Sequence, residues 1–366
     1  MNAEPSGRST LRRRLATATA AGACTVTVLT ATALTGAWSP PAPGPAVAAD
    51  PWVGALVAAP VGTLPDPAPP TRTSTVVLPG VPGQVTLLTD LRYATASPSE
   101  VLDLWLPPHT GRLVPLVIFL HGGAFVEGDK SDYAPMAEPV LRSGYAVASI
   151  NYRMTGEQGF PAAVQDTKAA VRWLRAHART YGLRADRFAV WGESAGGYLA
   201  AMAGATGSQH TGFDVAALGN AATSSAVQAV VDEYGPTDFL TMDAESVVPG
   251  GCPGDWWMRH DDPDSPDSLW LGGPAPLVPA VARSASVLTY VAKAAKGTLP
   301  PFAVDHGAED CTVPYGQSLD LVRALRARTA QVSFTLVAEA GHSDPLLHDR
   351  MDAPTIHWLH TILDRR

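Results

Sequence analysis

The feature that most constrains the fold is the repeated alternation of short apolar runs with segments of helical periodicity. The runs "LVPLVIFL" (113–120) and "YAVASINY" (145–152) are apolar almost throughout, as expected of strands buried on both faces of a parallel sheet. Segments 161–182 and 318–329 instead repeat apolar residues every three or four positions. The alternation predicts one doubly wound α/β domain over residues 77–366, with a mostly parallel sheet and helices on both faces.

Three further segments extend this pattern. Residues 84–93 and 100–107 alternate apolar and polar side chains, which is typical of antiparallel strands. Residues 354–366 have apolar positions on one face of a predicted final helix. The domain should therefore begin with antiparallel strands and close with an amphipathic helix.

The pattern breaks over residues 236–293, which are rich in Gly, Pro, Asp and Trp. This segment is too long for a simple connection in a compact domain, so we interpret it as a cap or substrate-binding insertion. Its Trp256 and Trp257 belong either to the core of that cap or to a substrate contact surface. Its aspartates lack the spacing of a calcium-binding loop, and we predict no metal there.

The N-terminal residues have the pattern of a targeting segment. An arginine cluster (12–14) precedes a run of apolar and small residues, and Ala46, Val47 and Ala48 form a cleavage pattern. We predict a signal peptide over residues 1–49, a secreted protein, and no membrane span in the mature form, with a retained anchor as the alternative. A Pro-rich leader is expected at 50–76.

Charge and cysteine content limit the partners and the redox chemistry. With 26 Lys and Arg against 34 Asp and Glu, the net charge is −8, which argues against nucleic-acid binding. After removal of residues 1–49 two cysteines remain, Cys252 and Cys311. In an exported protein this pair permits a disulfide, and two separate thiols are the alternative.

The segment "WGESAGG" (191–197) carries the first chemical signal. Its G-x-S-x-G motif follows a predicted strand and precedes a predicted helix, which is the context of a nucleophilic serine on a tight turn. Small residues on both sides let that turn close. Ser194 is therefore the predicted nucleophile, and it requires a histidine base and an orienting carboxylate.

Both partners are found downstream, each after a predicted strand. Asp310 is the predicted acid and His342 the predicted base, since open α/β sheets gather their sites at the carboxyl ends of strands. Glu309 is the competing acid and Asp344 a weaker one. The alternative for each residue is a structural role, because aspartates often cap turns and this chain has 10 histidines.

The glycine pair in "HGGAF" (121–125) ends another predicted strand. Acyl transfer passes through an oxyanion that needs preorganised N–H donors, and Gly122, Gly123 and Ala195 can supply backbone amides. A simple glycine turn is the alternative. Phe125 and Glu193, beside these donors and the nucleophile, are candidate substrate contacts. His121 is expected to hold the loop through a hydrogen bond.

Together, "HGGAF", "INYRM", "GESAGGYLAA", "YGPTDF", "HGAEDCTVPYGQS" and "AGH" resemble segments of the α/β-hydrolase superfamily. The chain is most similar to secreted bacterial esterases grouped with feruloyl and acetyl-xylan esterase domains, and more distantly to hormone-sensitive-lipase-like esterases. The resemblance implies an α/β-hydrolase fold, the site roles given above and a serine carboxylesterase without a cofactor. Many relatives have a third glycine where this chain has Ala124.

The expected substrate is a small-molecule or polymer-linked ester, and the oligomeric state is open. Two related reactions remain as alternatives: those of a prolyl-oligopeptidase-like peptidase and of an arylformamidase-like amidase. A binding protein without catalysis is a third alternative, but such proteins usually lose a member of the triad.

Overall fold

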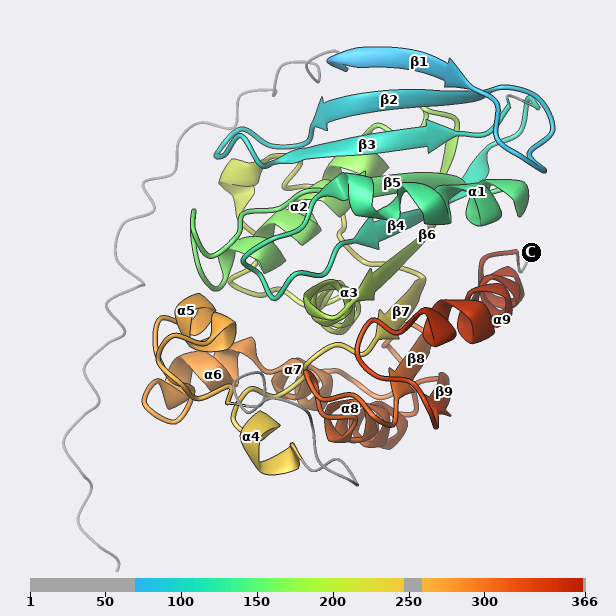
Figure 1. Cartoon of the computed structure of the whole chain (residues 1–366). Helices are drawn as coiled ribbons and strands as arrows, with labels where there is room; N and C mark the ends of the chain where they lie inside the picture. The colour runs from blue at the N-terminus through green and yellow to red at the C-terminus, as the bar shows by residue number, and fades with distance from the viewer. Residues whose placement is uncertain (1–69, 109, 247–258, 365–366) are drawn as a thin grey trace, which may run out of the picture. The chain divides into compact units, whose positions relative to one another are not determined.

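A single mixed β-sheet organises the molecule (Figure 1). The structure, a computed structural model, describes residues 70–108, 110–246 and 259–364. Within them nine strands pair in the order β1-β2-β3-β5-β4-β6-β7-β8-β9. The strands are β1 (Arg72–Val76), β2 (Val85–Arg92), β3 (Val101–Leu106), β4 (Val114–Leu120), β5 (Ala146–Ile150), β6 (Leu183–Glu193), β7 (Ala229–Glu233), β8 (Phe302–Gly307) and β9 (Val332–Val337).

The direction of the strands follows the sequence pattern. β1, β2 and β3 pair antiparallel and β3 joins β5 antiparallel, whereas every pair from β5 through β4 to β9 is parallel. β5 is buried along its whole length, and β4 is buried from Leu116 onward. The prediction of a mostly parallel sheet with antiparallel strands at its start is therefore confirmed.

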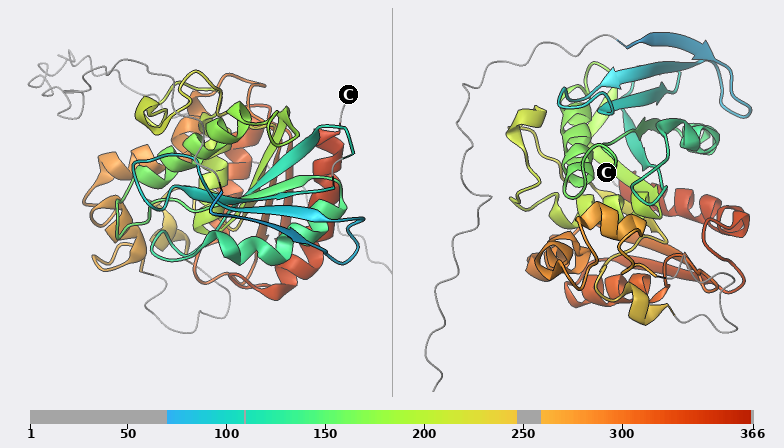
Figure 2. Two further views of the ribbon diagram at one scale, coloured as in Figure 1. Left: turned by 90° about the horizontal axis from the view of Figure 1, so that it is seen from above. Right: turned by 60° about the vertical axis from the view of Figure 1, so that its left-hand side comes forward.

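Helices cover both faces of this sheet, as the two views in Figure 2 show. They are α1 (Ala134–Arg142), α2 (Ala162–Ala176), α3 (Ala195–Thr206), α4 (Met242–Glu245), α5 (Pro266–Leu271), α6 (Pro279–Ala285), α7 (Val287–Lys293), α8 (Gly316–Ala327) and α9 (Pro345–Leu363). Two 3-10 helices accompany them, η1 (Lys130–Tyr133) and η2 (Ala216–Leu218).

Successive side chains of β4 build the two sides of the core. Ile118 packs in a buried cluster with residues of α2, α3 and α8. Its neighbours Val117 and Phe119 point to the other face, where they pack in a second cluster with residues of α1 and α9. Because side chains alternate along a strand, one apolar run supplies both layers. This confirms the doubly wound arrangement.

Two boundaries differ from the sequence-based expectation. The predicted leader at 50–76 overlaps β1, because Arg72–Val76 pairs with β2 and so belongs to the sheet. The final helix begins before Pro354: Asp344 accepts a hydrogen bond from Leu346 N, and Pro345 occupies the first helical turn. Residues 1–49, predicted as a signal peptide, lie outside the described residues.

The interval between β7 and β8 contains α4 to α7 in its described part. α7 packs against α3 and α8, while α5 and α6 pack against each other. Figure 1 shows α4 to α7, the helices of the interval that the sequence predicted as a cap. No helix in the described ranges is both long and apolar enough to span a membrane.

Candidate active site

Ser194 stands alone between the end of β6 and the start of α3. Its backbone has φ 52° and ψ −121°, a conformation that L-residues rarely adopt. Ser194 N donates to Glu233 O at 2.8 Å, which fixes the turn to the neighbouring strand. A Cβ added to Gly196 would overlap the Leu120 carbonyl, and one added to Gly192 would overlap the Gly196 carbonyl. The small residues of the motif are therefore required by close backbone contact.

His342 and Asp310 come from two other loops and complete a chain of hydrogen bonds. His342 Nε2 lies 3.0 Å from Ser194 Oγ, and His342 Nδ1 lies 2.7 Å from Asp310 Oδ2. Asp310 follows β8 and His342 follows β9, so both sit beyond the carboxyl ends of parallel strands. The structure thus brings the three sequence-predicted side chains together in the order required for proton transfer.

The surroundings of Asp310 favour the ionised carboxylate. Burial alone would raise its pKa, but the charge and hydrogen bonds of His342 and His306 lower the pKa well below the usual range. Asp310 Oδ1 also accepts hydrogen bonds from the backbone N–H groups of Thr312 and Val313, each at 2.8 Å. A fixed negative charge therefore faces His342 Nδ1.

The two competing acids occupy other places. Glu309 is exposed, next to the buried Asp310. Asp344 caps α9 by accepting from Leu346 N at 2.9 Å. Neither has a hydrogen bond to His342 among those found in the described part of the chain.

The glycine pair of the loop after β4 serves two different geometric needs. A Cβ on Gly122 would lie 3.4 Å from Ser194 Cβ, so this backbone passes directly beside the nucleophile. Gly123 has φ +99°, and a Cβ there would overlap the Glu127 carbonyl; Gly123 O accepts from Val126 N and Glu127 N. The next residues, Ala124 and Phe125, also have positive φ values of 50° and 63°. The loop is therefore a tight, left-handed turn.

His121, directly after the end of β4, packs against this loop. Its ring stacks on Tyr152 with centroids 4.3 Å apart, and its Nδ1 lies 2.9 Å from Gly122 O. Tyr152 OH donates to His121 O at 2.7 Å. Burial lowers the pKa of His121, so the neutral imidazole is favoured in this packed position.

Ser194 opens into a cavity of about 220 Å³, called here the Ser194 cavity. Ala124, Phe125 and Ala195 form the wall near the nucleophile, while the insertion between β7 and β8 supplies much of the opposite wall. The described lining residues are Ala124, Phe125, Ser194, Ala195, Pro236, Met242, Arg259, His260, Asp262, Asp264, Ser265, Pro266, Asp267, Thr312 and Val313.

Phe125 is fixed by an aromatic cluster behind the cavity. Its ring stacks on Trp270 at 4.1 Å between centroids and meets Tyr198 edge-on at 5.5 Å. Since Trp270 lies on α5, this stack ties the loop after β4 to the insertion. Phe125 therefore contributes both to the core and to the wall of the cavity.

Glu193 lies on the other side of the nucleophile. Because side chains alternate at the end of β6, Glu193 turns away from the Ser194 cavity and lines a separate cavity with Gly122, Gly123 and His348. Glu193 Oε2 accepts a hydrogen bond from Tyr234 OH at 2.7 Å. Glu193 is therefore not among the described residues that line the Ser194 cavity, and its role as a substrate contact stays a prediction.

Three positions named in the sequence analysis fall in the interval between α4 and α5 in the sequence. Trp256, Trp257 and Cys252 lie outside the described residues. Cys311, next to Asp310, is disulfide-bonded. Cys24 and Cys252, the other two cysteines of the chain, both lie outside the described ranges.

Two contributors to the site were missed in the sequence. His306 is completely buried, with Nε2 2.9 Å from Val313 O and 3.2 Å from Asp310 Oδ2, and Nδ1 2.7 Å from Ser318 Oγ. Tyr234 packs its ring edge-on against His342, with centroids 4.9 Å apart. His306 lies inside an apolar strand pattern and Tyr234 at the end of another, so no local signal in the sequence distinguishes them from core residues.

The insertion also places a hydrogen-bonded His–Asp pair in the Ser194 cavity. His260 Nδ1 lies 2.6 Å from Asp267 Oδ2, and His260 N donates to Asp243 at 2.7 Å. Burial alone would lower the pKa of His260, but the contact with Asp267 and the nearby Asp243 and Asp261 raise the pKa. Asp262 and Asp264 of the same segment are exposed and line the opening of this cavity.

A mostly parallel sheet with a serine on a strand-to-helix turn, and an acid and a histidine after later strands, defines an α/β-hydrolase. Residues 102–325 match the model of the family described as BD-FAE. The chain belongs to the BD-FAE family.

Named relatives and a solved structure agree with this assignment. Esterase LipC of Mycobacterium tuberculosis is 29% identical over 275 residues, which are 73% of this chain and 62% of LipC. Esterase LipQ of the same organism is 29% identical over 310 residues, which are 81% of this chain and 68% of LipQ. The solved truncated form of a carbohydrate esterase from gut microbiota has a TM-score of 0.67 at 25% identity, covering 81% of this chain and all of that one. The chain thus spans less than two thirds of the length of LipC.

Proposed function

We propose that this protein is a serine carboxylesterase that hydrolyses small carboxylic esters through an acyl-enzyme. The observation that carries the proposal is the chain of hydrogen bonds from Ser194 Oγ through His342 to Asp310 at the edge of a cavity. The names of its relatives, esterases LipC and LipQ, support hydrolysis of carboxylic esters.

In the proposed mechanism His342 acts as the base. His342 Nε2 takes the proton of Ser194 as Oγ attacks the ester carbonyl, and then donates that proton to the departing alcohol. Water, deprotonated by the same nitrogen, then attacks the acyl carbon; the bond to Ser194 Oγ breaks, His342 returns the proton to Oγ, and the acid is released. The ionised Asp310 holds His342 Nδ1–H and stabilises the imidazolium that forms in each step.

The backbone supplies the proposed oxyanion hole. Ala195 begins α3, so its N–H is one of the first-turn amides without an intrahelical acceptor. The amides of Gly122 and Gly123 lie in the rigid turn beside Ser194. Donors held in place before the reaction stabilise the developing negative charge without reorganisation, which is the main source of rate enhancement in acyl transfer.

The size and charge of the Ser194 cavity indicate the substrate class. A cavity of about 220 Å³ is smaller than sites for drug-sized ligands, so the acyl group should be short. The described lining includes three aspartates, Asp262, Asp264 and Asp267, but only one arginine, Arg259. This excess of acidic side chains disfavours anionic substrates. The likeness to a carbohydrate esterase supports a carbohydrate as the group that carries the ester.

The proposal includes export of the enzyme, for which the support is the signal-like sequence of residues 1–49. Cleavage of amides or peptides is the alternative reaction, because the same triad attacks both kinds of carbonyl. Comparison of ester and anilide substrates separates the two.

The first experiment is hydrolysis of nitrophenyl esters from acetate to palmitate, with an aminoacyl-anilide in parallel. We expect turnover to be highest for the short acyl chains and to be lost in Ser194→Ala. Intact-mass detection of an acyl adduct on the wild type, absent in Ser194→Ala, tests the covalent step. Full activity in a folded Ser194→Ala variant would refute the mechanism, and anilide cleavage without ester preference would refute the substrate class.

A further inference from the structure

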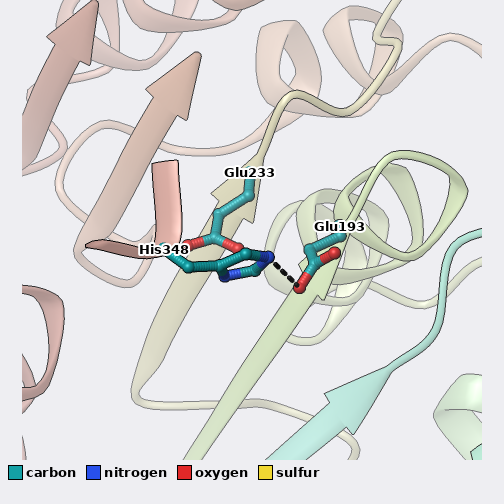
Figure 3. A group of neighbouring side chains, drawn as sticks. All are labelled: Glu193, Glu233 and His348. Carbon is teal, nitrogen blue, oxygen red and sulfur yellow. Dashed lines mark ion pairs between the residues drawn. The ribbon is translucent and has the colours of Figure 1, made fainter. Parts of the chain in front are cut away.

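A second group of titratable side chains lies behind the nucleophile, outside the proposed acyl transfer (Figure 3). Glu193 ends β6, Glu233 ends β7 and His348 lies in the first turns of α9. One ligand atom from each residue lies within 4.8 Å of those of the other two. This arrangement, called here the Glu–Glu–His cluster, joins three elements that are distant in the sequence.

Glu233 is the member that most needs a partner. Its side chain is 3% exposed, and its Oε2 is buried without a hydrogen-bond partner in the described part of the molecule. A buried carboxylate oxygen without a partner costs free energy, so the site should hold a positive group or a proton.

His348 is oriented like a metal-binding histidine. Its Nε2 is 3.9 Å from Glu193 Oε1, and its Nδ1 faces Asp352 Oδ1 at 3.4 Å on the following turn of α9. A carboxylate on one ring nitrogen commonly fixes the tautomer that offers the other nitrogen to a metal. Asp352 would thus support His348 from outside the cluster.

Carboxylates outnumber cationic groups at the cluster in the described part of the chain. Three carboxylates (Glu193, Glu233 and Asp352) surround one imidazole, and the ion pairs found for them in the described ranges involve only His348. Glu193 has a further hydrogen bond from the neutral Tyr234 hydroxyl. A divalent cation would offset the excess negative charge.

We propose that Glu193, Glu233 and His348 bind one divalent transition-metal ion, of which Zn²⁺ is the representative. Imidazole together with carboxylates favours Zn²⁺ or Mn²⁺ over Mg²⁺, which prefers oxygen ligands alone. Ligand atoms around zinc are roughly 3.4 Å apart, so the side chains must close by about 1.4 Å.

An entry path exists beside the cluster. A second cavity of about 670 Å³ is lined by Glu193, His348 and Asp352, together with Gly122 and Gly123 of the loop after β4. The cation would join β6, β7 and α9, and α9 begins three residues after His342. Its role would be to stabilise this end of the molecule, apart from the bond-breaking steps at Ser194.

Equilibrium dialysis and calorimetry with ZnCl₂ on tag-free, chelator-treated protein test the site directly. We expect one Zn²⁺ per chain, a raised Tm, and no displacement by a large excess of Mg²⁺. His348→Gln should weaken binding at least tenfold. His357→Gln is the matched control, because His357 is an exposed histidine on the same helix, and it should bind as the wild type does.

Glu233→Gln separates the metal site from a buried carboxyl that simply keeps its proton. Removal of a buried acid should leave or raise the Tm of the metal-free protein while removing the Tm increase caused by Zn²⁺. If Zn²⁺ does not bind, or binds equally to His348→Gln and Glu233→Gln, the proposal is refuted. Binding is measured without turnover, so this result and a failure of the esterase proposal are independent.

Discussion

Replacement of Asp310 by asparagine tests the proposed mechanism most sharply, because it changes one functional group and little of the packing. The amide oxygen can keep both hydrogen bonds that Asp310 Oδ1 accepts from Thr312 N and Val313 N. The amide NH₂ then faces His342 Nδ1, and two hydrogen-bond donors would oppose each other if Nδ1 kept its hydrogen. His342 must therefore place its hydrogen on Nε2, toward Ser194 Oγ, and can no longer act as the base.

The expected loss is about 10³- to 10⁴-fold in kcat, which corresponds to roughly 4–5.5 kcal/mol of transition-state stabilisation. Stability should change by only about 1–2 kcal/mol, since two of the hydrogen bonds remain and His306 keeps Val313 O as an acceptor. Steady-state hydrolysis of nitrophenyl acetate, with circular dichroism and urea unfolding in parallel, measures both quantities.

Glu309→Gln is the control, because this exposed neighbour competes with Asp310 as the candidate acid in the sequence. Its activity should equal that of the wild type. The reasoning fails if folded Asp310→Asn keeps more than a tenth of the wild-type kcat, or if Glu309→Gln shows the larger loss.

Three other substitutions test separate parts of the structure. Gly123→Ala should reduce kcat about 10²- to 10³-fold, because a Cβ at this position overlaps Glu127 O and displaces the loop. Ala124→Gly is the control and should keep the wild-type kcat. Equal kcat values for the two variants in ester hydrolysis would contradict this prediction. Burial raises the pKa of Asp305 to about 7 in the folded protein, whereas an Asp in the unfolded chain has a pKa of about 4. Between these two pH values the folded protein keeps a proton on Asp305 that the unfolded chain has lost. Stability should therefore fall as pH rises through this window, and Asp305→Asn should flatten the fall in urea titrations from pH 4 to 8; an unchanged slope would contradict the assignment. Asp166→Ala should cost about 3–5 kcal/mol in urea unfolding, because it removes the bidentate partner of the buried Arg153; a loss below 1 kcal/mol would show that Glu100, 3.8 Å away, suffices.

The sequence predicted the strands from β2 to β9 and the side chains of Ser194, His342 and Asp310 that meet at the site, because these signals are local. Burial on both faces leaves an apolar run such as that of β4, and a strained turn demands the glycines around Ser194. The catalytic roles of Ser194, His342 and Asp310 stay predictions until activity is measured.

Other features depend on which segments come together in space. His306 supports Asp310 only because β8 and α8 pack side by side, and nothing in its own neighbourhood of the sequence indicates that contact. Glu193 lines the second cavity because side chains alternate along β6, and the motif in the sequence does not show which face each residue takes. β1 was assigned to the leader because five residues are too few to show a period against a Pro-rich background.

The hydrogen bond between His342 and Ser194 joins residues 148 positions apart. During synthesis Ser194 leaves the ribosome long before His342 exists, and the turn around Ser194 is tied to Glu233 of β7, which also arrives later. If the proposed mechanism holds, a growing chain cannot hydrolyse esters until β8, β9 and the loops that carry Asp310 and His342 have been made and packed. Ester hydrolysis would thus report on completed assembly of the sheet, and the first appearance of activity would time the last step of folding.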